Sequence, residues 1–69
     1  MKKLSARNQL PATVTSVKLG GIMAEVVMTS GNIELVAAIT RGSAEALGLK
    51  AGDTVKAIIK STEVMIDKA

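Results

Sequence analysis

Short polar side chains and single cations occur together at three places in the sequence. They form the segments SARN at residues 5–8, TRGS at residues 40–43 and KST at residues 60–62. Hydroxyl groups, backbone N–H groups and an Arg or Lys side chain are hydrogen-bond donors. A tetrahedral oxyanion needs such donors, because all of its oxygens are acceptors. If the fold brings the three segments together, they would form an oxyanion site that requires no metal ion.

Each of these segments also has a purely structural explanation when it is considered singly. Ser43 suits the N-cap of a helix, Ser61 and Thr62 are common turn residues, and Arg7 and Lys60 suit solvated surface positions. Composition and spacing do not distinguish phosphate from other tetrahedral oxyanions or from a carboxylate. The combination of the three segments is therefore what favours a binding site.

The chain lacks two residue types on which many enzymes depend for catalysis. The chain has no His and no Cys, so no imidazole or thiolate is present to activate a nucleophile or to hold zinc. The six acidic residues are scattered, so we expect no pair of carboxylates in one cleft. There is no glycine-rich phosphate loop. We therefore expect a binding protein and not an enzyme.

An OB-fold nucleic-acid-binding module is the alternative from another functional class. Small barrels of that type bind single strands by stacking bases on aromatic side chains, and this chain has no Phe, Tyr or Trp. Its net charge of +3 is spread from Lys2 to Lys68, which makes a positive groove weak. Titration with single-stranded oligonucleotides would distinguish this alternative from oxyanion binding.

Alternating apolar residues predict the strands that must position the polar segments. We expect strands over residues 10–17, 22–29, 33–39 and 54–60, and a short last strand over residues 63–67. In the first of these strands, one face is expected to carry Leu10, Ala12, Val14 and Ser16.

Residues 42–49 have the composition of a short helix. Ser43 suits its N-cap, and a glycine suits its C-terminal cap. The whole order predicts an all-β fold, a five-stranded OB-like Greek-key barrel with one short helix between strands 3 and 4.

The size and composition of the chain predict an oligomer. Its 69 residues are 48% apolar but include no aromatic residue and no cysteine. A lone core of such small side chains rarely contributes more than ~3–5 kcal/mol, so we expect an obligate homo-oligomer. No apolar run approaches the ~20 residues of a membrane span, and the basic start lacks the apolar stretch of a signal peptide. The expected location is the cytoplasm.

Four motifs resemble the molbindins, the small molybdenum–pterin-binding (Mop) proteins of the TOBE/Mop domain family. This domain is also found in molybdate-responsive regulators and transporter ATPases. The motifs are SARNQL at residues 5–10, AEVV at 24–27, ITRGSAEALGL at 39–49 and AIIKSTEVMI at 57–66. They cover nearly the whole chain in the order of the family. The chain departs from the family at Pro11 and Ala12, where Lys-Gly is more frequent, and in a shorter loop at residues 30–32.

The resemblance implies a single Mop domain over residues 1–69 that assembles as a hexamer, a trimer of dimers. It implies that the bound ligand is molybdate or tungstate, held at subunit interfaces for intracellular molybdenum storage or homeostasis. No catalysis, other cofactor, nucleic acid or membrane is implied. One subunit would contribute Ser5, the Ala6 backbone, Arg7, Lys60 and Ser61, and its neighbour would contribute Thr40 and Ser43. For Asn8 we expect a structural hydrogen-bonding role.

Overall fold

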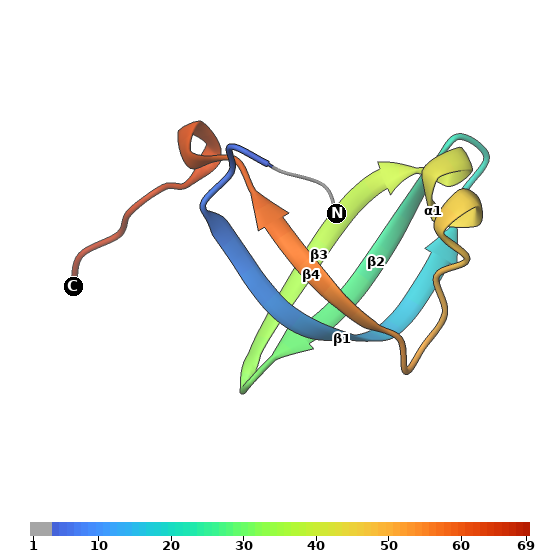
Figure 1. Cartoon of the computed structure of the whole chain (residues 1–69), viewed down its shortest axis with the longest axis horizontal. Helices are drawn as coiled ribbons and strands as arrows, with labels where there is room; N and C mark the ends of the chain where they lie inside the picture. The colour runs from blue at the N-terminus through green and yellow to red at the C-terminus, as the bar shows by residue number, and fades with distance from the viewer. Residues whose placement is uncertain (1–3) are drawn as a thin grey trace.

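One antiparallel sheet, bent over itself, forms most of the molecule (Figure 1). The computed structural model describes residues 4–69, and the sheet order within them is β3-β2-β1-β4. The elements are β1 (Asn8–Leu19), β2 (Met23–Ser30), β3 (Ile33–Thr40), α1 (Arg41–Leu47), β4 (Thr54–Ile59) and the 3-10 helix η1 (Ser61–Glu63).

Strand β1 is long enough to pair with two different strands. Its first half pairs with β4, from Asn8 opposite Ile59 to Thr13 opposite Thr54. Its second half pairs with β2, and Leu19 lies opposite Ala24. Because one strand serves both neighbours, the sheet curves into an incomplete barrel.

A β-bulge at Thr15 changes which side chains of β1 face the interior. The pairing with β2 shifts register between Val14 and Ser16, and the Thr15 hydroxyl donates to the carbonyl oxygen of Val27 at 3.0 Å. One extra residue reverses the alternation of a strand. Ala12 and Val14 therefore point inward before the bulge and Val17 packs against the core after it. The prediction that Ser16 lies on the same face as Ala12 and Val14 is wrong for this reason.

Pro11 lies within β1 without weakening the pairing to β4. The Ser30 hydroxyl donates to the Pro11 carbonyl oxygen at 2.7 Å. The nitrogen and the carbonyl of one strand residue point to the same side, so the Pro11 nitrogen faces Ser30 and not β4. The missing N–H group therefore removes no hydrogen bond from the β1–β4 ladder.

A two-residue turn at Gly31 and Asn32 joins β2 to β3. Ser30 pairs with Ile33, and Gly31 has a φ of 62°. A positive φ at the first central position is the requirement of a type II′ hairpin turn, where glycine has no steric penalty. The turn sets the register in which β2 and β3 bring Ala24, Val26 and Met28 inward.

Helix α1 begins earlier than the sequence indicates. Its N-cap is Thr40, whose side chain accepts a hydrogen bond from the Ser43 N–H group, so the prediction that Ser43 is the N-cap is wrong. Gly48 ends the helix in the left-handed conformation, with a φ of 62°. Its N–H group donates to Glu45, and that of Leu49 donates to Ala44. Ala44 is the buried side chain that attaches the helix to the sheet.

Small aliphatic side chains form the core. The buried cluster consists of Ala12, Val14, Val26 and Met28, and further apolar residues of β3 and β4 pack around it. Other large apolar side chains remain exposed on the edge strands, among them Val36 and Ile58. The core of one chain is therefore small and consists of aliphatic side chains alone.

The fold class predicted from the sequence is confirmed as mostly β with one short helix after the third strand. The last strand, predicted over residues 63–67, is not observed in the described part of the chain. Helix η1 occupies its start, and residues 64–69 form no strand. Within residues 4–69 no strand pairs with them, so the barrel described there has four strands and is not closed.

Candidate functional site

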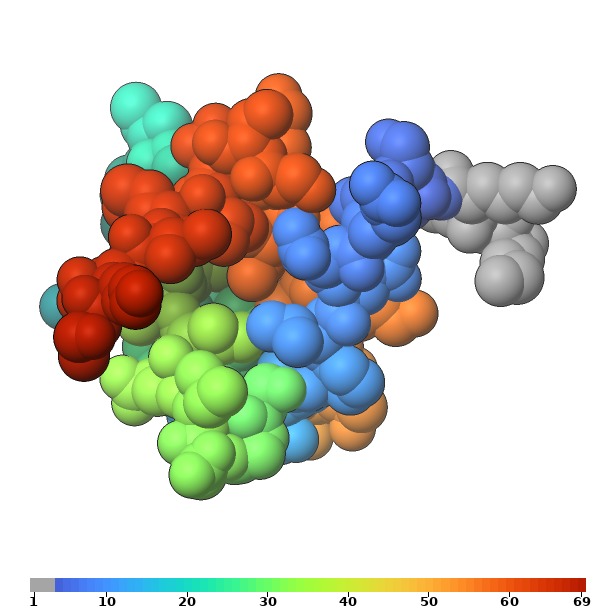
Figure 2. Space-filling model, turned by 90° about the vertical axis from the view of Figure 1, so that its left-hand side faces the viewer, coloured from blue at the N-terminus to red at the C-terminus, as the bar shows by residue number. Residues whose placement is uncertain are grey.

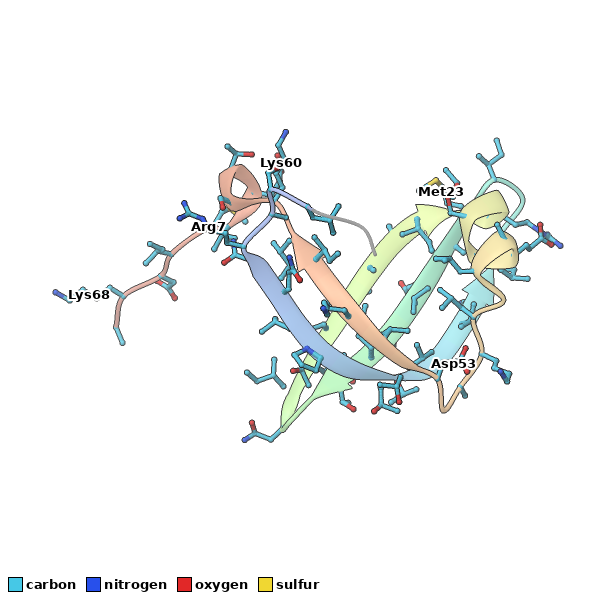
Figure 3. The ribbon with its side chains drawn as sticks, in the orientation of Figure 1. Arg7, Met23, Asp53, Lys60 and Lys68 are labelled. Atoms are coloured by element: carbon cyan, nitrogen blue, oxygen red, sulfur yellow. The ribbon has the colours of Figure 1, made fainter. Side chains whose placement is uncertain are left out.

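The first group of predicted site residues lies where β1 begins and β4 ends. Asn8 is paired with Ile59, so residues 5–7 and residues 60–61 leave the sheet next to each other. Figure 3 shows Arg7 and Lys60 at this same end of the molecule. The group consists of Ser5, Ala6, Arg7, Lys60 and Ser61, and we call it the strand-end group.

Two side-chain amides hold the strand-end group in place. The Asn8 Nδ2 donates to Ser61 Oγ at 3.4 Å and thereby links the two segments. The Gln9 Nε2 donates to the carbonyl oxygen of Ala6 at 2.7 Å. Asn8 has the hydrogen-bonding role that the sequence suggested, whereas the role of Gln9 was not foreseen.

The two cations of the strand-end group are exposed and have no carboxylate partner within residues 4–69. The ion pairs there join Arg41 to Glu45 at 3.3 Å and Lys50 to Asp53 at 3.0 Å. The positive charges of Arg7 and Lys60 are therefore not balanced by an acidic side chain of the described chain. Such charges are suited to an anionic ligand.

The second group lies at the start of α1 and consists of Thr40 and Ser43. The Thr40 hydroxyl accepts from the Ser43 N–H group at 3.1 Å and donates to Ser43 Oγ at 2.7 Å. Since Ser43 Oγ accepts this bond, the Ser43 O–H group remains able to donate outward. We call these two residues the helix-start group, and both are exposed.

The strand-end and helix-start groups lie at opposite ends of the molecule. Thr40 is the register partner of Met23, which Figure 3 shows far from Arg7 and Lys60. Within a single chain, the fold brings Ser5, Ala6, Arg7, Lys60 and Ser61 together but separates them from Thr40 and Ser43. A site containing both groups therefore needs two chains.

Arg41 lies between Thr40 and Ser43 in sequence but is occupied elsewhere. Its guanidinium donates through Nε to Glu45 and through Nη1 to the carbonyl oxygen of Gly20 at 3.1 Å. The Arg41 N–H group also donates to the carbonyl oxygen of Ile22 at 2.7 Å. Arg41 thus fastens the start of the helix to the β1–β2 turn, and the nearest cation is not directed to the helix-start group.

Asp53, outside both groups, has a perturbed acidity. Its carboxylate accepts hydrogen bonds from Lys50 Nζ and from the Lys50 N–H group, each at 3.0 Å. These bonds, with the nearby positive charge, hold the pKa of Asp53 below its ordinary value of 3.8. This ion pair fixes the loop before β4, where the Asp53 carbonyl accepts from Val14.

No three His, Cys, Asp or Glu side chains in this part of the chain gather as ligands for a metal ion. No helix of the described residues is both long enough and apolar enough to cross a membrane.

Comparison with known proteins gives the family. The TOBE domain model matches residues 4–66. The chain belongs to the TOBE domain family. Within it, this TOBE domain is 47% identical over 64 residues to molybdenum-pterin-binding protein 1 of Clostridium pasteurianum, covering 91% of the chain and 94% of that protein. The resemblance to Mop proteins predicted from the four motifs is therefore confirmed.

Solved structures of similar proteins have the same fold as this TOBE domain. A molybdate-binding protein from Sporomusa ovata superposes with a TM-score of 0.93 at 46% identity, covering 97% of this chain and 100% of that one. MopII from C. pasteurianum superposes with a TM-score of 0.89 at 42% identity, covering 96% of this chain and 100% of that one. The arrangement of strands and helix is thus that of known Mop proteins.

Proposed function

We propose that this protein binds molybdate or tungstate at interfaces between its own subunits and stores or buffers the anion without catalysing a reaction. The strand-end group of one subunit would meet the helix-start group of its neighbour around the anion. The proposal takes residues 1–69 as one domain, with a hexamer as the assembly and the cytoplasm as the location. Relatives whose names state molybdenum-pterin or molybdate binding support the ligand.

The separation of the two groups is the observation on which the proposal depends. Arg7 and Lys60 present unbalanced charge at one end of the molecule, and Ser43 presents a hydroxyl donor at the other. A small dianion needs several donors on different sides. Donors at opposite ends of one chain converge only when a second chain is placed head to tail against the first.

The chemistry of each donor fits a tetrahedral dianion. Arg7 offers two parallel N–H donors and Lys60 a compact charge. Ser61 Oγ accepts from Asn8, and Ser43 Oγ accepts from Thr40, so each hydroxyl keeps its own hydrogen for the anion. No described acidic side chain pairs with Arg7 or Lys60, so no carboxylate would have to be displaced from these cations.

Binding at an interface would also link occupancy to assembly. A ligand that only the oligomer recognises stabilises the oligomer by mass action, by about 2.7 kcal/mol when its concentration is a hundredfold above Kd. Molybdate should therefore raise the thermal midpoint and the proportion of assembled protein together. Coupling between anion binding and assembly would let a storage protein respond to the concentration of the anion.

Isothermal titration calorimetry with molybdate tests the assignment of the site. Replacing Arg7 or Lys60 by Ala should weaken binding at least ten- to hundredfold, since each removes at least one charge-assisted hydrogen bond of about 1.5–3 kcal/mol. Lys18→Ala is the matched control, because it lowers the net charge equally and Lys18 lies opposite Glu25, outside both groups. Circular dichroism checks that each variant is folded.

Unchanged affinity in both the Arg7 and the Lys60 variants would show that the assigned residues are wrong. Weakening by the Lys18 variant to the same degree would show that overall charge, and not a built site, attracts the anion. Saturable binding of a single-stranded oligonucleotide in the absence of any molybdate response would favour the nucleic-acid-binding alternative.

A further inference from the structure

Gln9 is the second residue of β1, and its side chain turns back towards the segment that precedes the strand. Its Nε2 donates to the carbonyl oxygen of Ala6 at 2.7 Å, within the range of a well-formed hydrogen bond. Gln9 is half-buried, whereas its neighbours Asn8 and Leu10 are exposed. Loss of this bond would leave a partly buried amide without a partner, which is unfavourable.

The sheet does not fix the segment that Gln9 contacts. Residues 5–7 precede β1, and within residues 4–69 their N–H groups donate to no backbone carbonyl oxygen. In this described part of the chain, the bond from Gln9 is the one hydrogen bond that reaches the segment from outside it. The orientation of the Ala6 carbonyl therefore depends on Gln9.

The direction of the Ala6 carbonyl also sets the direction of the Arg7 N–H group. A peptide group is planar and trans, so its C=O and N–H bonds point to opposite sides. Because the Ala6 carbonyl is held towards Gln9, the Arg7 N–H group is directed away from Gln9. A carbonyl oxygen repels an anion, whereas backbone N–H groups attract one. Gln9 thus determines which side of this peptide is available to an anion.

Asn8 has the corresponding effect on the second segment of the strand-end group. Consecutive residues of a strand point to opposite faces, so Asn8 and Gln9 reach different neighbours. The Asn8 Nδ2 donates to Ser61 Oγ at 3.4 Å, and the Ser61 hydroxyl keeps its own hydrogen for another acceptor. Figure 2 shows the start of β1 (blue) and the chain after β4 (orange) side by side at the surface. Two adjacent amides therefore engage one acceptor on each of the two segments.

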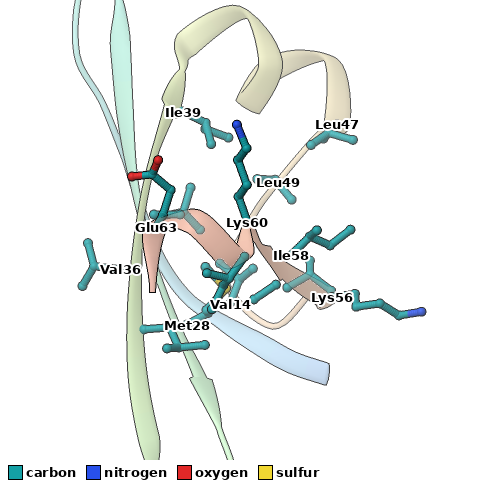
Figure 4. Close-up of a pocket in the computed structure, with 16 residues that line it drawn as sticks. Val14, Met28, Val36, Ile39, Leu47, Leu49, Lys56, Ile58, Lys60 and Glu63 are labelled. Carbon is teal, nitrogen blue, oxygen red and sulfur yellow. The ribbon is translucent and has the colours of Figure 1, made fainter. Parts of the chain in front are cut away.

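The acidic side chain nearest in sequence to Lys60 and Ser61 is directed elsewhere. Lys60 and Glu63 both line an apolar cleft of about 460 Å³, where the Glu63 carboxylate points away from the Lys60 ammonium group (Figure 4). No ion pair within residues 4–69 joins these two residues. The acceptors that an anion would meet in the strand-end group are thus its backbone carbonyls, and Gln9 engages that of Ala6.

We propose that Gln9 is a positioning residue of the oxyanion site, which engages the Ala6 carbonyl so that the peptide between Ala6 and Arg7 presents its N–H group to the anion. Gln9 itself does not contact the anion. The proposal rests on the proposed function, because the anion is the one held by the strand-end group. It adds to that function a backbone donor and the side chain that orients it.

Replacing Gln9 by Met tests the role of the amide, since Met has a similar length but no N–H donor. In isothermal titration calorimetry, Gln9→Met should bind molybdate about three- to tenfold more weakly, the effect expected from one neutral hydrogen bond. Gln9→His is the conservative variant, because a neutral imidazole at about pH 8 keeps one N–H donor, and it should bind within about twofold of the natural protein. Thr13→Val is the control, since it removes a hydroxyl from the same face of β1 at the other end of the pairing with β4.

The amide resonance of Arg7 distinguishes positioning from a general loss of stability. In ¹H–¹⁵N NMR spectra, molybdate should move the Arg7 amide proton of the natural protein downfield, as expected when this N–H group donates to an anion. In the Gln9→Met variant saturated with molybdate, the displacement should fall by about half or more. A purely structural role for Gln9 would lower the thermal midpoint without changing this displacement in the saturated protein.

Equal affinity of the natural protein and the Gln9→Met variant would overturn the proposal, and so would an equal displacement of the Arg7 amide proton. Weakening of the same size in the Met and His variants would also overturn it, because the N–H donor would then not be the cause. If the natural protein binds no molybdate, the proposed function and this proposal both fail. Normal binding by the natural protein and by both Gln9 variants refutes this proposal alone.

Discussion

Thr40 is predicted to stabilise the fold as the N-cap of α1, a role that can be separated from oxyanion binding. Its Oγ1 accepts from the Ser43 N–H group at 3.1 Å. Replacing Thr40 by Val keeps the shape of the side chain but removes this acceptor. Thr40 is also the last residue of β3, and Val is at least as favourable as Thr in a strand. A loss of stability would therefore come from the helix and not from the strand.

The expected loss is about 1 kcal/mol in the free energy of unfolding. An N-cap replaced by a residue without an acceptor costs about 0.5–2 kcal/mol. The Thr40 hydroxyl also donates to Ser43 Oγ at 2.7 Å, but that atom is exposed and water can replace the donor, so this bond adds little. The helix cannot fray freely to relieve the loss, because Ala44 at its middle is only 3% exposed. For a domain of this size, 1 kcal/mol lowers Tm by about 4–8 °C.

Thermal unfolding followed by circular dichroism measures this loss, at one subunit concentration because assembly makes Tm concentration-dependent. Thr40→Ser is the matched control, since Ser is a good N-cap residue. Its free energy of unfolding should lie within about 0.5 kcal/mol of that of the natural protein. Ser43→Ala should change stability little but weaken molybdate binding, because Ser43 Oγ takes no part in the cap. If Thr40→Val and Thr40→Ser were equally stable, the assignment of the N-cap would be refuted.

Three further predictions concern the elements that hold the site. Gly20→Ala should cost about 1–3 kcal/mol, because the added Cβ would lie 2.8 Å from a backbone carbonyl oxygen in the same turn. Gly21→Ala, with nothing within 4 Å of its added Cβ, is the control, and equal unfolding midpoints would contradict the expected clash. Asp53→Asn removes the carboxylate charge that Lys50 stabilises. Because the pKa of Asp53 is lower in the folded protein than its ordinary value of 3.8, the ionised carboxylate stabilises the fold above pH 3.8, and this stabilisation is lost as the pH falls towards the lowered pKa. The Asn variant should thus unfold at a lower temperature at pH 7 and approach the natural protein at acidic pH, and a difference independent of pH would exclude this linkage. Val14→Ala should lower the free energy of unfolding, measured by urea denaturation, by about 2–3 kcal/mol, since the Val14 side chain is only 1% exposed. A loss of less than about 1 kcal/mol would mean that the core relaxes to fill the cavity left by the substitution.

Local patterns in the sequence predicted most of the strands. Alternating residues indicated the four strands that are observed. The composition of residues 42–49 indicated a helix of about the right place and length. These features depend on contacts between residues that are close in the chain, so they can be recognised from spacing alone.

The prediction is wrong where the face or the hydrogen-bond partner of a residue depends on more than the local pattern of residue types. The bulge at Thr15 moves Ser16 outward and Val17 inward, and no local pattern announces it. Thr40 and Ser43 are both residue types that favour the N-cap position. Thr40 is the N-cap because β3 ends at Thr40 and the helix begins at the next residue. The last predicted strand failed because a strand requires a partner, and the described chain provides none for residues 64–66.

The sequence by itself determined the family, the types of donor available for an anion and the lack of His and Cys, because these depend only on which residues are present and in what order. The tertiary structure decided which donors are neighbours. Pairing of Asn8 with Ile59 brings Arg7 next to Lys60 across more than fifty residues of sequence, while the same sheet holds Thr40 at the far end. Long-range register is a property of the whole sheet, and it is the reason why one chain has only part of the proposed site.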